Sequence, residues 1–149
     1  MYKSVHEMKE AHRKLYNGFP KGFAFNNEQF REMMSGWGLC NGKDGNPTAK
    51  DKEQIVSIGA GGFIRRTDVP AYMELMKRID AEEKEFRRDK KKFTEEIYHA
   101  MQNVEYHINT QGNYDVCNEL GRREEDLEKD PYFAACFEAA RKKFLKNCA

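Results

Sequence analysis

Apolar residues recur at helical spacing near the start of the chain. Residues three or four apart predict an amphipathic helix over 4–16, and they are Val5, Met8, Ala11, His12 and Leu15. Gly18 and Pro20 end this helix. Farther along, Asn26 or Asn27 caps a second helix over about 27–35, with Gln29 placed to close a capping box.

Three short runs have the composition of β-strands. Residues 55–58 and 62–65 flank a group of glycines, which tolerate positive φ, so an antiparallel hairpin is expected there. Residues 23–25 are a plausible third strand. Between these runs, residues 36–52 are rich in Gly, Asn, Asp and Pro, which indicates an irregular surface loop anchored by Trp37.

A long helical pattern follows a cap at Thr67 or Asp68, with Pro70 in its first turn. Unbroken over 69–108, it would form a rod about 60 Å long, which one domain of this size could hardly cover. Residues 80–92 are charged around most of the circumference, which is typical of a solvated face or a helix-to-helix corner. An arm offered to a partner is the alternative.

The same segment carries a sparse apolar seam at Ile79, Phe86 and Phe93, spaced by seven. It supports either a helix pair within the chain or a homodimer. The last third predicts helices near 114–120 and 123–129, then one that opens at Asp130 and Pro131. The pattern predicts a single α+β domain over 1–149, predominantly helical, with a small antiparallel sheet near 55–65 and a long charged central helix.

Composition and charge narrow the function. The 149 residues include 26 Lys and Arg against 25 Asp and Glu, so no global field directs the chain to nucleic acid or a membrane. No apolar run suits a signal peptide or a membrane span, which predicts a protein of the cytoplasm of its host cell. The spacing of the four cysteines, Cys40, Cys117, Cys136 and Cys148, fits reduced thiols rather than a zinc site.

Candidate catalytic motifs are weak. The glycines at 59–62 lack the third glycine of a dinucleotide loop and any following Lys-Ser or Lys-Thr pair, which favours a tight turn. The histidine spacings do not place two ligands on one helix face, so neither a metal nor a cofactor is expected. The chain is therefore expected not to be an enzyme. The alternative requires a pocket that contains two or more of His99, Glu105, Tyr106 and His107.

Several segments together resemble a family: FAFNNEQF at 23–30, IVSIGAGGFIRRTD at 55–68, NVEY at 103–106, and the NELG, DPYF and ARKKF elements of 118–144. Over about 18–145 the chain is similar to small uncharacterised accessory proteins of phages and conjugative elements of gut bacteria. Such proteins include anti-CRISPR inhibitors. The resemblance implies binding to a host nuclease complex by steric occlusion, without an active site.

The sequence therefore predicts an interaction protein whose partner is a host protein or nucleoprotein such as a CRISPR effector. The expected contacts are the basic clusters and one aromatic residue, with the 38–52 loop as part of a second patch: Arg65, Arg66, Arg87, Arg88, Lys90, Lys91, Lys92 and Trp37. The alternative is a small nucleic-acid-binding regulator that acts directly through these basic clusters and a further one at 141–143.

Overall fold

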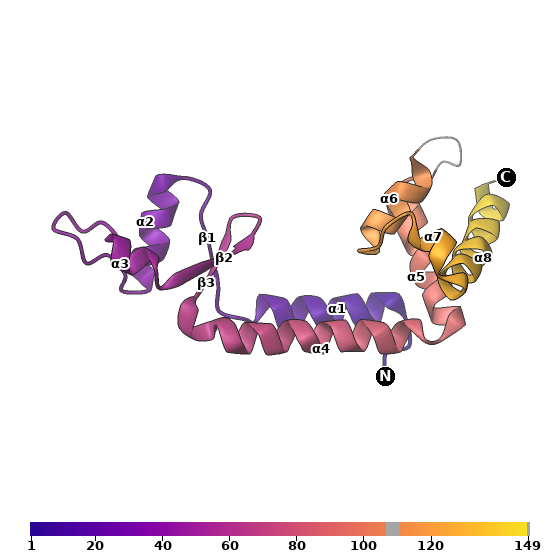
Figure 1. Ribbon diagram of the computed structural model, residues 1–149, viewed down its shortest axis with the longest axis horizontal. Coiled ribbons are helices and arrows are strands. Elements are labelled where there is room, and N and C mark those ends of the chain that lie inside the picture. Colours follow the sequence, from indigo (N-terminus) through magenta and orange to yellow (C-terminus); the bar gives the residue numbers. More distant parts are fainter. Residues whose placement is uncertain (107–110, 149) are drawn as a thin grey trace. The chain divides into compact units, whose positions relative to one another are not determined.

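The structure is a computed structural model that describes residues 1–106 and 111–148 (Figure 1). His107 and Ile108, which belong to the predicted helical segment, lie outside the described residues. The elements in chain order are α1 (Val5–Asn17), β1 (Gly22–Phe23), α2 (Asn27–Gly36), α3 (Ala49–Lys52), β2 (Ile55–Gly59), β3 (Gly62–Arg65), a 3-10 turn (Arg66–Asp68), α4 (Val69–Arg87), α5 (Lys90–Asn103), α6 (Gly112–Glu119), α7 (Asp126–Lys129) and α8 (Pro131–Cys148).

The predicted fold class is confirmed: the chain is predominantly helical with a small antiparallel sheet, and α4 is its long charged helix. The residues gather into two compact units. Unit 1 contains Met1–Ala11 and Ala81–Ala149, and unit 2 contains His12–Asp80. This division does not test the prediction of one domain over 1–149. Within the described residues, every helix is too short or too polar to cross a bilayer.

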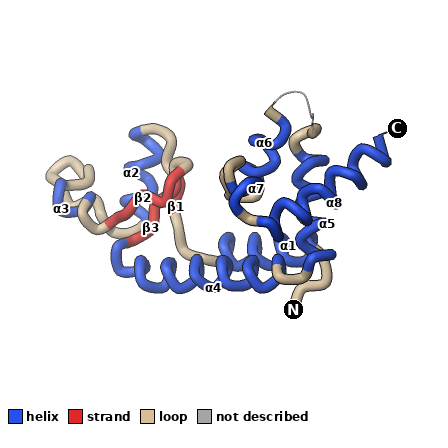
Figure 2. The backbone as a smooth tube through the Cα atoms, turned by 45° about the vertical axis from the view of Figure 1, so that its right-hand side comes forward, coloured by secondary structure: helices blue, strands red, loops and turns tan. Residues whose placement is uncertain are grey.

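The sheet of unit 2 has three antiparallel strands in the order β1-β3-β2 (Figure 2). The hairpin and the presence of a third strand confirm the prediction from sequence, although that strand is Gly22–Phe23 rather than 23–25. The turn between β2 and β3 is tight because Gly59, Ala60 and Gly61 all have positive φ, at 89°, 50° and 76°. Helix α2 packs on this sheet, with the rings of Phe30 and Phe63 5.7 Å apart in an edge-to-face arrangement.

Helix α2 begins where the sequence predicted, with one difference at its cap. The Asn26 side chain accepts a hydrogen bond of 2.8 Å from the Gln29 backbone N–H. Gln29 does not return the bond to Asn26 as a capping box would; its Oε1 accepts from the Phe25 N–H at 2.9 Å. The side chain of Gln29 therefore ties the end of the β1 segment to the first turn of α2.

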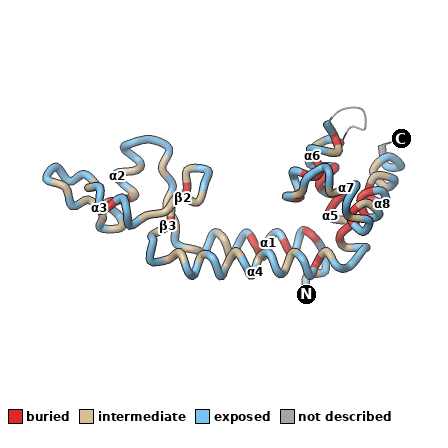
Figure 3. The backbone as a smooth tube through the Cα atoms, viewed as in Figure 1, coloured by how far each residue is buried: buried red, intermediate tan, exposed pale blue. Residues whose placement is uncertain are grey.

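The core of unit 1 lies among α5, α6 and α8, where buried residues concentrate (Figure 3). Phe93 of α5 stacks on Phe133 of α8 with ring centroids 5.7 Å apart. The Asp130 side chain caps α8 by accepting from the Phe133 N–H at 3.1 Å, as the Asp-Pro pair predicted. Buried apolar residues thus hold α5 against α8 through the aromatic faces that the sequence placed on these helices.

A second small cluster of unit 1 joins the start of α1 to the end of α4. Val5, Met8 and Phe86 are buried together there. Phe93 instead belongs to the larger core, so the two phenylalanines serve different clusters. The predicted seam of residues spaced by seven is therefore not continuous, because the chain turns between Phe86 and Phe93. Phe86 takes the within-chain alternative, a contact between helices of one chain.

Candidate binding surface

The chain turns a corner between α4 and α5, within the charged segment. Helix α4 ends at Arg87 and α5 begins at Lys90. Asp89 has an extended conformation and caps α5, because its Oδ1 accepts from the Lys92 N–H at 3.1 Å. Of the interpretations that the sequence allowed for this charged run, the structure has the helix-to-helix corner, while its use as an arm for a partner stays a prediction. An unbroken rod over 69–108 is therefore excluded.

Arg87 holds the corner together from the inside. Its Nε and Nη2 each donate a hydrogen bond of 2.8 Å to the Glu96 carboxylate. Only 16% of the Arg87 side chain and 4% of the Glu96 side chain are exposed. The guanidinium also lies over the Phe93 ring, 5.5 Å from its centroid. Arg87, predicted as a partner contact, is thus engaged in a buried, bidentate ion pair.

The other predicted residues of this segment differ in how far they reach solvent. Arg88, Lys90 and Lys91 are exposed, and we call these three residues the basic corner. Arg88 makes an exposed ion pair with Glu85 at 3.1 Å. Lys92 is half-buried with its ammonium over the Phe86 ring, 5.8 Å from the centroid. The basic corner is therefore the part of the predicted cluster that is open to a partner.

The backbone of the basic corner is fixed by a residue of α8. The Tyr132 hydroxyl lies 2.6 Å from the carbonyl oxygen of Arg87 and 3.0 Å from that of Arg88. Together with the Asp89 cap and the Arg87 ion pair, this contact orders the turn that carries the exposed cations. The corner presents its charges on an ordered backbone.

The remaining predicted contacts lie in unit 2. The Arg65 Nε is 3.0 Å from Asp68 Oδ2. Arg66 is exposed, and its Nε donates to the Glu53 carbonyl at 2.6 Å. Both arginines therefore order the end of the hairpin, where it enters α4. Trp37 is half-buried at the end of α2, and a Cβ added to Gly22 would lie 3.2 Å from its ring. Its indole packs on the β1 backbone.

The loop of unit 2 is organised around a buried carboxylate. Asp51 accepts hydrogen bonds from the backbone N–H groups of Thr48 and Asn41, each at 2.9 Å, and from the Asn41 side-chain amide at 2.6 Å. These bonds, with the Thr48 backbone first, lower the pKa of Asp51 to about 2. Asp51 also belongs to a capping box that opens α3, a helix absent from the prediction.

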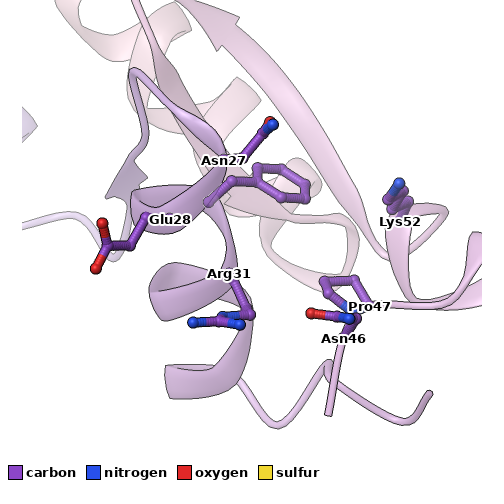
Figure 4. Close-up of a pocket in the computed structure, with 7 residues that line it drawn as sticks. Asn27, Glu28, Arg31, Asn46, Pro47 and Lys52 are labelled. Carbon is purple, nitrogen blue, oxygen red and sulfur yellow. The ribbon is translucent and has the colours of Figure 1, made fainter. Parts of the chain in front are cut away.

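An open hollow of about 640 Å³ lies between α2 and this loop (Figure 4). Asn27 and Arg31 come from α2, while Asn46, Pro47 and Lys52 come from the loop and α3. In Figure 4 the Glu28 carboxylate points away from the loop side of the hollow. The lining combines amide and charged side chains with the apolar Phe30 and Pro47, so the hollow offers both polar and apolar contacts to a segment of a partner.

A family model of unknown function, DUF7659, matches residues 4–143. The chain belongs to this family. Neither a curated protein nor a solved structure matches it. The DUF7659 match begins just before α1 and ends within α8, so it includes the basic corner of unit 1 and the hollow of unit 2.

The residues of the enzyme alternative that the structure of this DUF7659 protein describes are His99, Glu105 and Tyr106. His99 lines a cleft of unit 1 in which neither Glu105 nor Tyr106 takes part. Tyr106 is buried and donates to Asn113 Oδ1 at 2.7 Å, and burial raises the pKa of its hydroxyl. His107 lies outside the described residues. In the described part of the chain, no three His, Cys, Asp or Glu side chains gather as a metal site would require.

Sequence reasoning missed four residues that shape the surface. Asp89 lies within a run of charged residues, so its role as the N-cap of α5 was not recognised, although Asp is a common residue at this position. Thr48 and Asp51 have the spacing of a capping box, a signal that was present within the loop. Glu96 gave no signal, since its partner Arg87 is nine residues away and meets it only because the chain turns.

Proposed function

We propose that this DUF7659 protein is an accessory protein of a mobile element that binds a host defence nucleoprotein, such as an RNA-guided nuclease, and inhibits it by occlusion. The observation that supports the proposal is the basic corner. Its three cations, Arg88, Lys90 and Lys91, are exposed on one turn. The Asp89 cap and the Tyr132 hydroxyl hold the backbone of this turn in place.

An ordered turn with exposed positive charge is suited to binding a nucleoprotein. A complex of protein and guide RNA presents dense negative charge beside protein surface, and complementary charge speeds encounter and favours the right partner. Because the corner is already ordered, binding does not have to fix its backbone. Because the net charge of the chain is only +1, the molecule as a whole does not attract an anionic partner. Electrostatic attraction to such a partner would come from the local charge of the basic corner.

The class of partner comes from the resemblance to accessory proteins of phages and conjugative elements. Proteins of that kind include inhibitors that cover a working surface of a nuclease. Such inhibition needs contact area and no chemistry of its own. The basic corner and the open hollow of unit 2 are two surfaces of this chain that can supply contacts.

The test is a pull-down with tagged full-length protein from a bacterial host that carries active CRISPR systems, with and without nuclease treatment. One variant reverses the corner: Arg88→Glu, Lys90→Glu and Lys91→Glu. A matched control makes the same charge change at exposed lysines of unit 1: Lys129→Glu, Lys142→Glu and Lys146→Glu.

The proposal predicts that wild type and the control recover an effector complex that survives nuclease treatment, and that the corner variant loses it. Recovery of the same complex by the corner variant would show that this surface is not the contact. Recovery of no effector by wild type would contradict the proposed partner.

The same corner also supports a second candidate, direct binding of nucleic acid. Three exposed cations on one turn can each neutralise a phosphate. In that case binding to bare RNA or DNA weakens with salt, with a slope of the logarithms of about −0.9 for each contact on duplex DNA. Nuclease treatment would then abolish recovery from the lysate, which separates this candidate from the first.

A further inference from the structure

A cleft of about 450 Å³ in unit 1 is lined by the residues that open the chain and by α5. Lys3 and His6 contribute from the first side, and Lys91, Lys92 and His99 from the second. Buried Val5 and Phe86 form its apolar part. We call it the lysine cleft. Segments about 90 residues apart in sequence thus bring three lysines and two histidines around one space.

The acidic residues of the lysine cleft are already engaged. Asp89 accepts the Lys92 backbone N–H as the cap of α5. Glu95 pairs with Lys143 of α8 at 2.7 Å. Within the described residues, neither carboxylate is paired with Lys3, Lys91 or Lys92. Lys143 offsets the charge of Glu95, whereas Asp89 keeps its negative charge because a backbone N–H is neutral. Three lysines against this one carboxylate still leave the cleft with net positive charge, and the histidine side chains are further hydrogen-bond donors.

This combination favours phosphate over other anions. Lysine acts as a compact point charge and is a common phosphate ligand, whereas planar carboxylates are better matched by arginine. A single carboxylate would neutralise one of the three ammonium groups, while a phosphate monoester carries close to two negative charges near neutral pH. The cleft is also larger than one phosphate group, which leaves room for the moiety that carries it.

We infer that the lysine cleft binds a phosphate group through Lys3, Lys91 and Lys92, either from a free nucleotide or polyphosphate or from the end of a nucleic-acid strand. This inference goes beyond the proposed function, because the cleft can bind phosphate whether or not the basic corner contacts a nucleoprotein. Lys91 belongs to both surfaces, so the test uses Lys3 and Lys92, which belong to the cleft alone.

The test is a titration of ¹⁵N-labelled full-length protein with pyrophosphate at constant ionic strength, followed by NMR. The inference predicts saturable shifts of the amide resonances of residues 3–6 and 90–92. Lys3→Gln and Lys92→Gln should each weaken binding about tenfold, the usual effect of one lost charge-assisted contact. Lys146→Gln, at an exposed lysine of α8, should bind as wild type does.

Two further titrations identify the source of the phosphate. Adenosine monophosphate is compared with adenosine, and a short 5′-phosphorylated oligoribonucleotide with its 5′-hydroxyl form. Equal binding of the nucleotide and the phosphorylated strand supports a site for the phosphate group alone, while tighter binding of the phosphorylated strand supports a strand end. The inference is overturned if pyrophosphate causes no saturable shift, or if Lys3→Gln and Lys92→Gln bind it as tightly as Lys146→Gln. Thermal unfolding checks that each variant is folded.

Discussion

The guanidinium of Arg87 and the carboxylate of Glu96 face each other across the turn between α4 and α5, joined by two hydrogen bonds of 2.8 Å. Both side chains are largely withdrawn from water. One of the Arg87 donors also approaches the Leu120 carbonyl, at 3.4 Å. This pair therefore ties the corner to α5 and to the end of α6, and the ordered presentation of the basic corner depends on it.

Removing one partner of this pair should destabilise unit 1. Arg87→Ala leaves the Glu96 carboxylate buried without its cation, and we expect the free energy of unfolding to fall by about 3 kcal/mol. Urea denaturation measures the change. The control is Arg88→Ala, which removes an exposed ion pair and should change stability by less than about 0.5 kcal/mol. Equal effects of the two substitutions would show that Arg87 has no special structural role.

Asp51 should make the free energy of unfolding of unit 2 fall at acidic pH. Its pKa of about 2 in the folded chain lies below the ordinary value, so the ionised form is favoured by folding. The stabilisation is complete above about pH 4 and is lost as the pH falls toward about 2. Asp51→Asn should lower stability at neutral pH, and its difference from wild type should shrink through this window. A difference that stays constant with pH would contradict the assignment.

The cysteines should differ in reactivity because they differ in burial. Cys117 is fully buried, and burial raises the pKa of its thiol to about 11, which leaves little reactive thiolate. Cys40 is half-buried in the loop of unit 2. Alkylation of the folded protein, followed by peptide mapping, should modify Cys40 before Cys117, which should react only on unfolding. Labelling of both thiols at the same rate would contradict this packing.

Two glycines of unit 2 should respond to alanine with opposite signs. Gly36 ends α2, and a Cβ there meets nothing within 4 Å, so Gly36→Ala should stabilise by about 0.5 kcal/mol through the unfolded chain. A Cβ on Gly42 would lie 2.6 Å from the Asn46 carbonyl oxygen. Gly42→Ala should therefore destabilise, by about 1–2 kcal/mol. Urea denaturation of both variants gives the signs, and matching signs would refute the loop geometry.

Local signals in the sequence predicted most of the elements. The Asp130-Pro131 start of α8, the Asn26 cap of α2 and the glycine-rich hairpin each depend on neighbouring residues alone, and all three are confirmed. Local signals could not show which of the predicted contact residues are buried and which are exposed. Whether Arg87 is buried and Arg88 exposed depends on where the chain turns, which is decided by the burial of Phe86 and Phe93 in separate clusters.

The lysine cleft also could not be predicted from local sequence signals. Lys3 and His6 come from the opening of the chain, and Lys91 and His99 from α5. No spacing rule relates residues so far apart, and the tertiary contact of Val5 with Phe86 is what brings the two segments together. Charge counts along the chain, which are near balance, conceal a local excess of this kind.

The most direct test of the proposed function is target cleavage by a purified, guide-loaded nuclease identified in the pull-down, measured over a range of inhibitor concentrations. We expect wild type and the Lys129→Glu, Lys142→Glu, Lys146→Glu control to inhibit equally. The Arg88→Glu, Lys90→Glu, Lys91→Glu variant should require at least about tenfold more protein for half inhibition. Absence of inhibition by wild type, or equal inhibition by the corner variant, would contradict the proposal.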